Sequence, residues 1–246
     1  MNKAILCQML FLFFCIVSGS SQHKNILECM EIIGFNAFKY INYDALPSRW
    51  DTIIDVKAGY YEINYDFDVN GITKLCQVAK FNNSDGTILV GITGYYADGI
   101  CSGHPSKFYE ISKLRDSFLL VEQERIFPSL DFSMFFTNAK PIQALEKYLP
   151  EIREKYFNHL DTYKDSEATI KDLMEAIYDY HVIIPRKGTT AEVTLIVCDF
   201  DIFDTRIDEL NIDLDEWDNA IGGHIGVVEF AYNRDLKQFR PILGKE

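Results

Sequence analysis

Positive charge is scarce in this sequence. Its 246 residues carry 24 Lys and Arg against 37 Asp and Glu, which gives a formal net charge of −13 at pH 7. Proteins bind nucleic-acid phosphates and anionic lipid head groups mainly through Lys and Arg. The balance therefore argues against nucleic acid and anionic membrane surfaces as partners, and such acidity is typical of general solubility.

Recognisable catalytic signatures are also lacking. The five His are scattered, and none belongs to an H-E-x-x-H or H-x-H arrangement, so no zinc enzyme is indicated. The sequence contains no G-x-S-x-G nucleophile elbow, no G-x-x-x-x-G-K-[ST] phosphate loop and no G-x-G-x-x-G dinucleotide fingerprint. No cofactor is expected, and a non-enzymatic protein is expected ahead of an enzyme.

Long apolar runs are missing beyond the first residues. Met1-Asn2-Lys3 is followed by an apolar run over 4–17, broken only by Gln8, and then by small polar residues up to Ser21. A basic start, a short apolar core and a small-residue exit are typical of a secretory signal. The run is shorter than the roughly 20 residues that cross a bilayer. We therefore predict a signal peptide over 1–21, with an uncleaved membrane anchor as the alternative.

The remaining chain, 22–246, is predicted to be exported to the periplasm or beyond the cell. Gly19 and Ser21 fit the −3 and −1 positions of a cleavage before Gln22. Removing residues 1–21 takes away one Lys and no acid, so the formal charge changes from −13 to −14. No linker or repeat divides the rest. We expect one domain that is not an integral membrane protein after cleavage.

Cysteine is present in small number. Cys7 and Cys15 belong to the predicted leader, and the four that remain are far apart, with no C-x-x-C among them. Four Cys in an oxidising compartment suggest up to two disulfides, and three connectivities are open. We predict a bridge between Cys76 and Cys101, because both belong to the same run of strands. The second predicted bridge then joins Cys29 to Cys198.

A change of hydrophobic period organises the chain. Residues 25–42 have apolar positions at helical spacing, followed by a loop with Pro47. From about 58 to 123 the period becomes two, with turn residues between short runs. We predict an antiparallel meander of five strands over 61–67, 72–81, 87–95, 107–112 and 117–123. One face of the first strand is expected to be buried and the other wet.

The second half is predicted to hold a central helical segment and a C-terminal set of strands. The clearest helical stripe comprises Ile170, Leu173, Met174, Ile177 and Tyr178. Strand-like runs follow over 180–184 and 190–200, and a closing hairpin over 225–232 and 237–242. Because strands and helices are segregated along the chain, the sequence predicts an α+β fold.

Two acidic segments are candidate sites. Asp66-Phe67-Asp68-Val69-Asn70-Gly71 matches the first half of a calcium loop, with Asp66, Asp68 and Asn70 as candidate ligands, although Gln77 stands where the closing Glu belongs. The same residues are natural in a plain turn. The segment 199–218 is strongly acidic, and a pair of its carboxylates could serve as acid and base in hydrolysis. Most such segments are solvated loops.

Aromatic residues supply a third candidate. They make up 14% of the chain, and Tyr60-Tyr61 and Tyr95-Tyr96 each place one ring on either side of a predicted strand. Outward rings on neighbouring strands could form a platform for a glycan or a peptide. The candidate ligand-binding residues are Tyr60, Tyr96 and Trp217. Aromatic residues are also ordinary strand residues, so a structural role is the alternative.

Several short fragments together resemble uncharacterised exported proteins of Gram-negative bacteria. These are Ser20-Ser21-Gln22, Gly59-Tyr60-Tyr61, the hairpin from Lys80-Phe81 to Asp85-Gly86, Phe108-Tyr109-Glu110 and the turn at 184–190. The resemblance implies a β-rich domain in the cell envelope and transfers no activity.

Three hypotheses follow. The first is a non-enzymatic periplasmic or secreted binding or structural module whose partner is an envelope glycan, peptide or protein. The second is an extracytoplasmic hydrolase that uses carboxylates of 199–218. The third is a structural protein stabilised by calcium.

Overall fold

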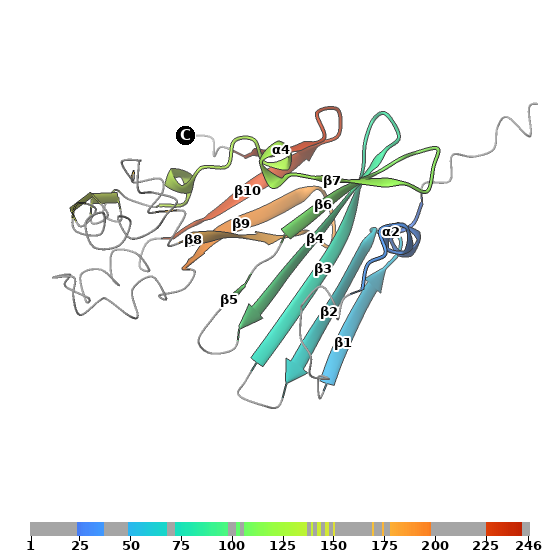
Figure 1. The fold of residues 1–246 in the computed structure, drawn as a ribbon, viewed down its shortest axis with the longest axis horizontal. Coiled ribbons are helices and arrows are strands. Elements are labelled where there is room, and N and C mark those ends of the chain that lie inside the picture. Colours follow the sequence, from blue (N-terminus) through green and yellow to red (C-terminus); the bar gives the residue numbers. More distant parts are fainter. Residues whose placement is uncertain are drawn as a thin grey trace, which may run out of the picture.

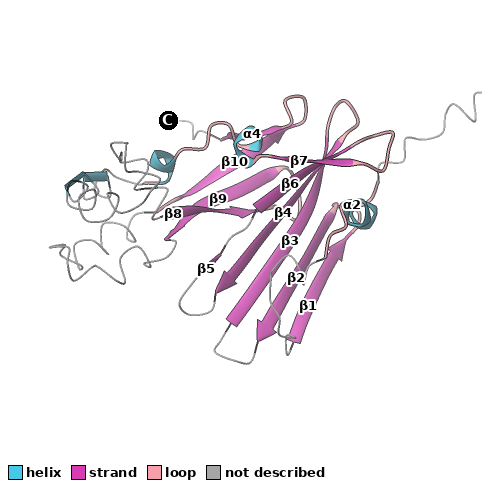
Figure 2. Ribbon diagram, in the orientation of Figure 1, coloured by secondary structure: helices cyan, strands magenta, loops and turns pink. Residues whose placement is uncertain are grey.

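Two antiparallel β-sheets form most of the protein in a computed structural model (Figure 1). The structure describes residues 24–36, 49–67, 72–97, 102–103, 106–136, 178–197 and 225–242, and the single or paired positions 139, 142–143, 146–147, 150, 169 and 174. The fold is β-rich, with few helices (Figure 2). No helix in these ranges is long and apolar enough to span a bilayer.

The larger sheet is the predicted meander with two additional strands. Its order is β1-β2-β3-β4-β6-β7, and the short β5 also pairs with β4. The five predicted strands are confirmed as β2, β3, β4, β6 and β7. The strand over 49–55 and the short β5 were not predicted. The bounds are β1 Arg49–Asp55, β2 Tyr60–Phe67, β3 Ile72–Asn82, β4 Ile88–Ala97, β5 Ser102–Gly103, β6 Ser106–Ile111 and β7 Phe118–Val121.

The smaller sheet contains the C-terminal strands in the order β11-β10-β9-β8. All of its strands were predicted, but the first begins earlier than expected. Tyr178 starts β8 and pairs with Val197, so its predicted place at the end of a helical stripe is wrong. The bounds are β8 Tyr178–Ile183, β9 Thr190–Val197, β10 Val227–Asn233 and β11 Gln238–Pro241.

Helices are short in the described residues. Helix α2 covers Ile26–Ile32, and Asn25 caps it by accepting from the main-chain N–H groups of Leu27 and Glu28. The prediction of a helix over 25–42 is wrong at 33–36, because the helix ends at Ile32 and Gly34 takes a left-handed φ of 63°. The rest of the predicted helix, 37–42, lies outside the described residues. Two more short helices are α4 Gln123–Ile126 and the 3₁₀ helix η1 Phe132–Phe135.

The main core lies between the two sheets. Alternate residues of β3 and β4, such as Phe81 and Leu89, face alternate residues of β9 and β10, such as Val193 and Phe230, and all four are buried. Phe127, in the chain between α4 and η1, fills the space beside them and stacks on Phe239 with ring centroids 4.8 Å apart. Burial of apolar surface between the sheets is therefore the main stabilising contribution.

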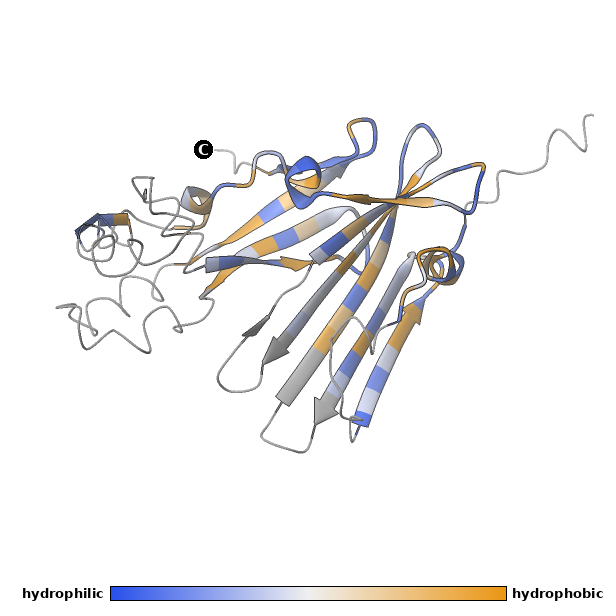
Figure 3. Cartoon of the chain, viewed as in Figure 1, coloured by the Kyte–Doolittle hydropathy of each residue, from blue (hydrophilic) through white to orange (hydrophobic). Residues whose placement is uncertain are grey.

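A second core covers the opposite face of the larger sheet. Ile26 and Cys29 of α2 are fully buried against Ile63, Val78 and Val90. Figure 3 shows the apolar side of α2 and the apolar bands along the strands. The middle of the larger sheet is thus covered on both faces. On the face of β2 that was expected to be wet, Tyr60 is buried, so the prediction is wrong at this end of the strand, whereas Asn64 is exposed as predicted.

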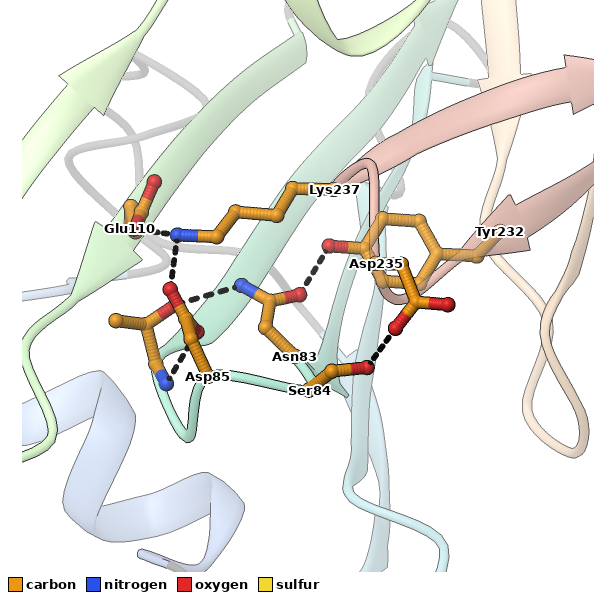
Figure 4. A network of polar contacts seen from close by, with 8 residues as sticks. Asn83, Ser84, Asp85, Glu110, Tyr232, Asp235 and Lys237 are labelled. Carbon is orange, nitrogen blue, oxygen red and sulfur yellow. Dashed lines mark hydrogen bonds and ion pairs between the residues drawn. The ribbon is translucent and has the colours of Figure 1, made fainter.

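A polar network joins the two sheets at the hairpin turns (Figure 4). Lys237, in the β10–β11 turn, lies 2.7 Å from an Asp85 carboxylate oxygen and 2.5 Å from one of Glu110. The Tyr232 hydroxyl donates to Asn83 Oδ1 at 2.5 Å, and Ser84 donates to Asp235. These bonds connect the β3–β4 turn to the C-terminal hairpin, which is far away in sequence.

Candidate functional site

The main candidate site is a cavity of about 810 Å³ beside β8, the outer strand of the smaller sheet among the described residues. The region from α4 through η1 supplies one part of its described wall, and β8 supplies another. Ile142 and Met174 also line the cavity. This volume lies within the roughly 300–1,000 Å³ that is typical of small-ligand sites. Its chemistry comes from two groups of side chains, four rings and three carboxylates.

The rings are held by contacts with one another. Phe132 stacks on Tyr180 with centroids 4.6 Å apart and planes 18° from parallel. The centroid of the Phe132 ring also lies 6.4 Å from that of Tyr178. Phe127 is almost completely buried, with 1% of its surface exposed. Burial raises the pKa of Tyr178 above its usual range, so its hydroxyl keeps its proton at neutral pH. The rings therefore form a fixed, uncharged aromatic wall, in which Phe127, Phe132 and Tyr178 are buried and Tyr180 is partly exposed.

The carboxylates belong to Glu124, Asp131 and Asp179. Asp131 is the N-cap of η1, and its Oδ1 accepts from the main-chain N–H of Ser133 at 2.8 Å and from the Ser133 hydroxyl. Oδ1 of Asp179 accepts from the main-chain N–H of Tyr180 at 2.7 Å. Two of the three carboxylates are therefore held in place by hydrogen bonds. Among the described lining residues there is no Lys, Arg or His.

A second polar feature is a row across the larger sheet. Glu62, Gln77, Thr93 and Ser106 are successive cross-strand partners on β2, β3, β4 and β6. Gln77 Nε2 donates to Glu62 Oε2 at 3.0 Å, and the Tyr60 hydroxyl also donates to this oxygen. The next row on this face contains Tyr60, Ala79, Gly91 and Phe108, which are buried. The polar row therefore lies at the boundary of the apolar core between the sheets.

The predicted aromatic platform is not formed by Tyr60. This residue has 2% of its surface exposed and belongs to the core between the sheets. Its ring faces the smaller sheet, because both faces of β2 are covered there, so the expectation of an outward ring is wrong. Tyr96 pairs with Lys74 through the main chain, but its side chain and Trp217 lie outside the described residues.

The calcium and hydrolase candidates lie almost entirely outside the described residues. Asp66 is in β2 opposite Thr73, whereas Asp68, Asn70 and the whole of 199–218 are not described. Within the described part of the chain, no three His, Cys, Asp or Glu side chains are grouped closely enough to hold a metal ion. Calcium binding and hydrolysis at these positions stay predictions.

Two of the four predicted bridging cysteines can be placed. Cys29 and Cys76 are buried free thiols in the core under α2. Burial raises the pKa of Cys29 to about 11 and that of Cys76 to about 12, which keeps both thiols protonated and weakly reactive. Their predicted partners, Cys101 and Cys198, lie outside the described residues.

Sequence reasoning missed the cavity, because its described walls come from segments about 50 positions apart. His181 follows the lining residue Tyr180 in β8. It is half-buried in β8 beside Tyr95, with ring centroids 5.8 Å apart, and burial lowers its pKa. The aromatic and acidic residues of 123–135 could have indicated the site, but they follow no recognisable spacing.

Fold and cavity together define a β-rich, two-sheet protein with an aromatic and acidic pocket. No family model matches the chain, and no curated protein matches it. Among solved structures, it is similar to a domain of an uncharacterized protein from Porphyromonas gingivalis W83, at 10% identity and a TM-score of 0.44. The match covers 89% of this chain and 98% of that chain. A similarity of this size does not establish a common fold.

Proposed function

We propose that the protein is an exported, non-enzymatic binding module whose cavity beside β8 takes an organic cation, such as the Lys or Arg side chain of a peptide. The observation that carries this proposal is the combination of ring faces and carboxylates in the cavity. Ring faces attract ammonium and guanidinium groups, and carboxylates form charge-assisted hydrogen bonds with them.

The arrangement of the wall supports binding. Asp131 and Asp179 are fixed by main-chain N–H donors, and Phe132 and Tyr180 are fixed by stacking. Groups already held in position lose little entropy when a ligand arrives. We also propose that the chain between η1 and β8 is the predicted central helical segment. Helical positions at 142–143, 146–147, 150 and 174 support this.

Export is part of the same proposal and rests on the predicted leader over 1–21. An exported partner of peptide or protein nature would meet the module in the envelope or outside the cell. Mass spectrometry of the protein purified after expression of the full chain measures the N-terminus. We expect it at Gln22, and a product that keeps Met1 would contradict export by this route.

The ligand class can be tested with matched peptides. Calorimetry would compare short peptides that carry Arg or Lys with the same peptides carrying citrulline or norleucine, and with neutral oligosaccharides. We expect the cationic peptides to bind at least about tenfold more tightly than the neutral ones, a difference of about 1.4 kcal/mol. Equal binding of citrulline and Arg peptides would sink the cation assignment, and binding of oligosaccharides alone would replace it with a glycan site.

The variant for this test is Asp131→Asn with Asp179→Asn. Asn keeps the Oδ1 acceptor that each Asp offers to Ser133 and Tyr180, so the charge is removed while the local geometry is kept. Asp51→Asn is the matched control, because Asp51 Oδ1 also accepts from the next main-chain N–H, at 2.9 Å, but on β1. We expect the double variant to lose affinity and the control to keep it.

A further inference from the structure

Strand β7 is an apolar edge of the larger sheet. In the part of the chain that the structure describes, it pairs only with β6. Phe118, Leu119 and Leu120 are 48%, 61% and 52% exposed. Proteins usually protect sheet edges with charged residues, Pro or bulges, because unpaired main-chain groups there can pair with another chain. Three consecutive exposed apolar residues on an edge strand lack this protection.

The hydrogen-bond pattern shows which groups of β7 face away from the sheet. The main-chain N–H of Ser112 donates to the carbonyl of Ser117 at 3.0 Å, so these opposite residues form a hydrogen-bonded pair. Such pairs alternate along an antiparallel ladder. Leu119 therefore directs its main-chain groups toward β6, whereas Phe118 and Leu120 direct theirs away from β6.

The charges on either side of β7 have opposite sign. The turn before the strand carries Lys113, Arg115 and Asp116, a net charge of +1, and Asp116 is paired with Lys24 at 3.0 Å. The residues after the strand carry Glu122, Glu124 and Arg125, a net charge of −1. Antiparallel pairing of β7 with an identical strand would place the basic end of each copy beside the acidic end of the other.

We propose that β7 is the interface through which two copies of this chain associate. The two strands pair antiparallel around a two-fold axis, with Phe118 of one copy opposite Leu120 of the other, which is the self-complementary arrangement of a symmetric dimer. The sheets of the two copies then form one continuous sheet. The contact is small compared with a standard interface of about 1,600 Å², so the dimer is weak and depends on concentration. The dimer does not involve the cavity beside β8.

The test measures molar mass by analytical ultracentrifugation over a range of concentrations, using the protein purified after expression of the full chain. Leu120→Pro removes a main-chain donor that faces away from β6 and leaves the bonds to β6, because Pro is tolerated where the N–H faces solvent. Leu120→Lys keeps the donor and adds charge to the apolar edge. Leu236→Lys is the matched control, since Leu236 is 54% exposed in the β10–β11 turn.

We expect the parent protein and Leu236→Lys to shift from monomer to dimer as concentration rises, and the two Leu120 variants to remain monomeric. Circular dichroism establishes that each variant is folded. If Leu120→Pro fails to fold, Leu120→Lys alone decides the question. A parent protein that stays monomeric throughout overturns the proposal. A dimer that persists in the folded Leu120 variants also overturns it, since the interface would then lie elsewhere.

Discussion

Lys237 illustrates how a single residue contributes to the contact between the sheets. It has a left-handed φ of 56°, which is uncommon for a residue with a side chain. From this position in the turn its ammonium group reaches both Asp85 and Glu110. Asp85 in turn accepts from the main-chain N–H of Thr87 at 3.0 Å. The backbone conformation at 237 is therefore accompanied by two ion pairs to the larger sheet.

This network predicts how stability depends on acid. The hydrogen bond from Lys237, followed by those from Thr87, lowers the pKa of Asp85 from 3.8 to about 2. A carboxylate with a lowered pKa in the folded state contributes stability that is present above the unfolded pKa and is lost as pH falls through the folded one. We expect Asp85→Asn to reduce the decline in the urea midpoint between about pH 4 and pH 2. A parallel decline in both proteins would contradict the assignment.

At the scale of elements, alternation of apolar and polar residues correctly predicted the strands that are separated by turn residues. It failed for β1, because Arg49-Trp50-Asp51-Thr52 has little apolar alternation and belongs to an edge strand with mostly exposed residues. It also failed at the start of β8, because adjacent apolar residues such as Ile177 and Tyr178 satisfy a helical stripe as well as a strand. The choice between the two periods depended on pairing with β9, which sequence does not show.

The site was less predictable than the strands. The wall of the cavity includes the stacked rings of Phe132 and Tyr180. This contact depends on how η1 packs against the smaller sheet. Tyr60 was assigned outward because one face of β2 was expected to be wet, but the smaller sheet covers that face at Tyr60, whereas Asn64 on the same face is exposed. Local patterns therefore predict which residues alternate, whereas the partner of each face is decided by tertiary packing.

One strand pair of the smaller sheet contains a like-charge contact. Glu192 of β9 lies directly opposite Glu229 of β10, and both side chains are exposed. Like charges in this position destabilise a sheet, by a fraction of a kcal/mol. We expect Glu192→Gln to stabilise the protein by about 0.5 kcal/mol in urea unfolding at low salt, and the gain to shrink at high salt.

A double-mutant cycle provides the control for this prediction. Once Glu192 is neutral, Glu229→Gln should add little, because the repulsion has already been removed. Additive gains from the two substitutions would show that each Glu acts through the overall negative charge of the protein and not through its cross-strand partner.

At the scale of the whole molecule, the close approach of the two sheets depends on Gly91. A Cβ at this position of β4 would lie 2.9 Å from Cδ1 of Ile184, which directly follows β8, and 3.0 Å from a ring carbon of Phe108. Ile184 and Phe108 are both buried, so neither has free space in which to move. We expect Gly91→Ala to destabilise the protein by about 1–3 kcal/mol, the usual cost of overpacking a core.

A second substitution distinguishes contact between the sheets from strain within β4. Ile184→Val removes the Cδ1 atom that the new methyl group would meet, and on its own it should cost about 0.5–1.5 kcal/mol. In the Gly91→Ala background we expect the same change to recover stability, measured as the urea midpoint. A cost for Ile184→Val that is the same in both backgrounds would mean that Gly91 is needed for β4 itself. Recovery would mean that the spacing between the sheets is set where Gly91 meets Ile184, so that the larger sheet and the C-terminal strands are stabilised by one shared core.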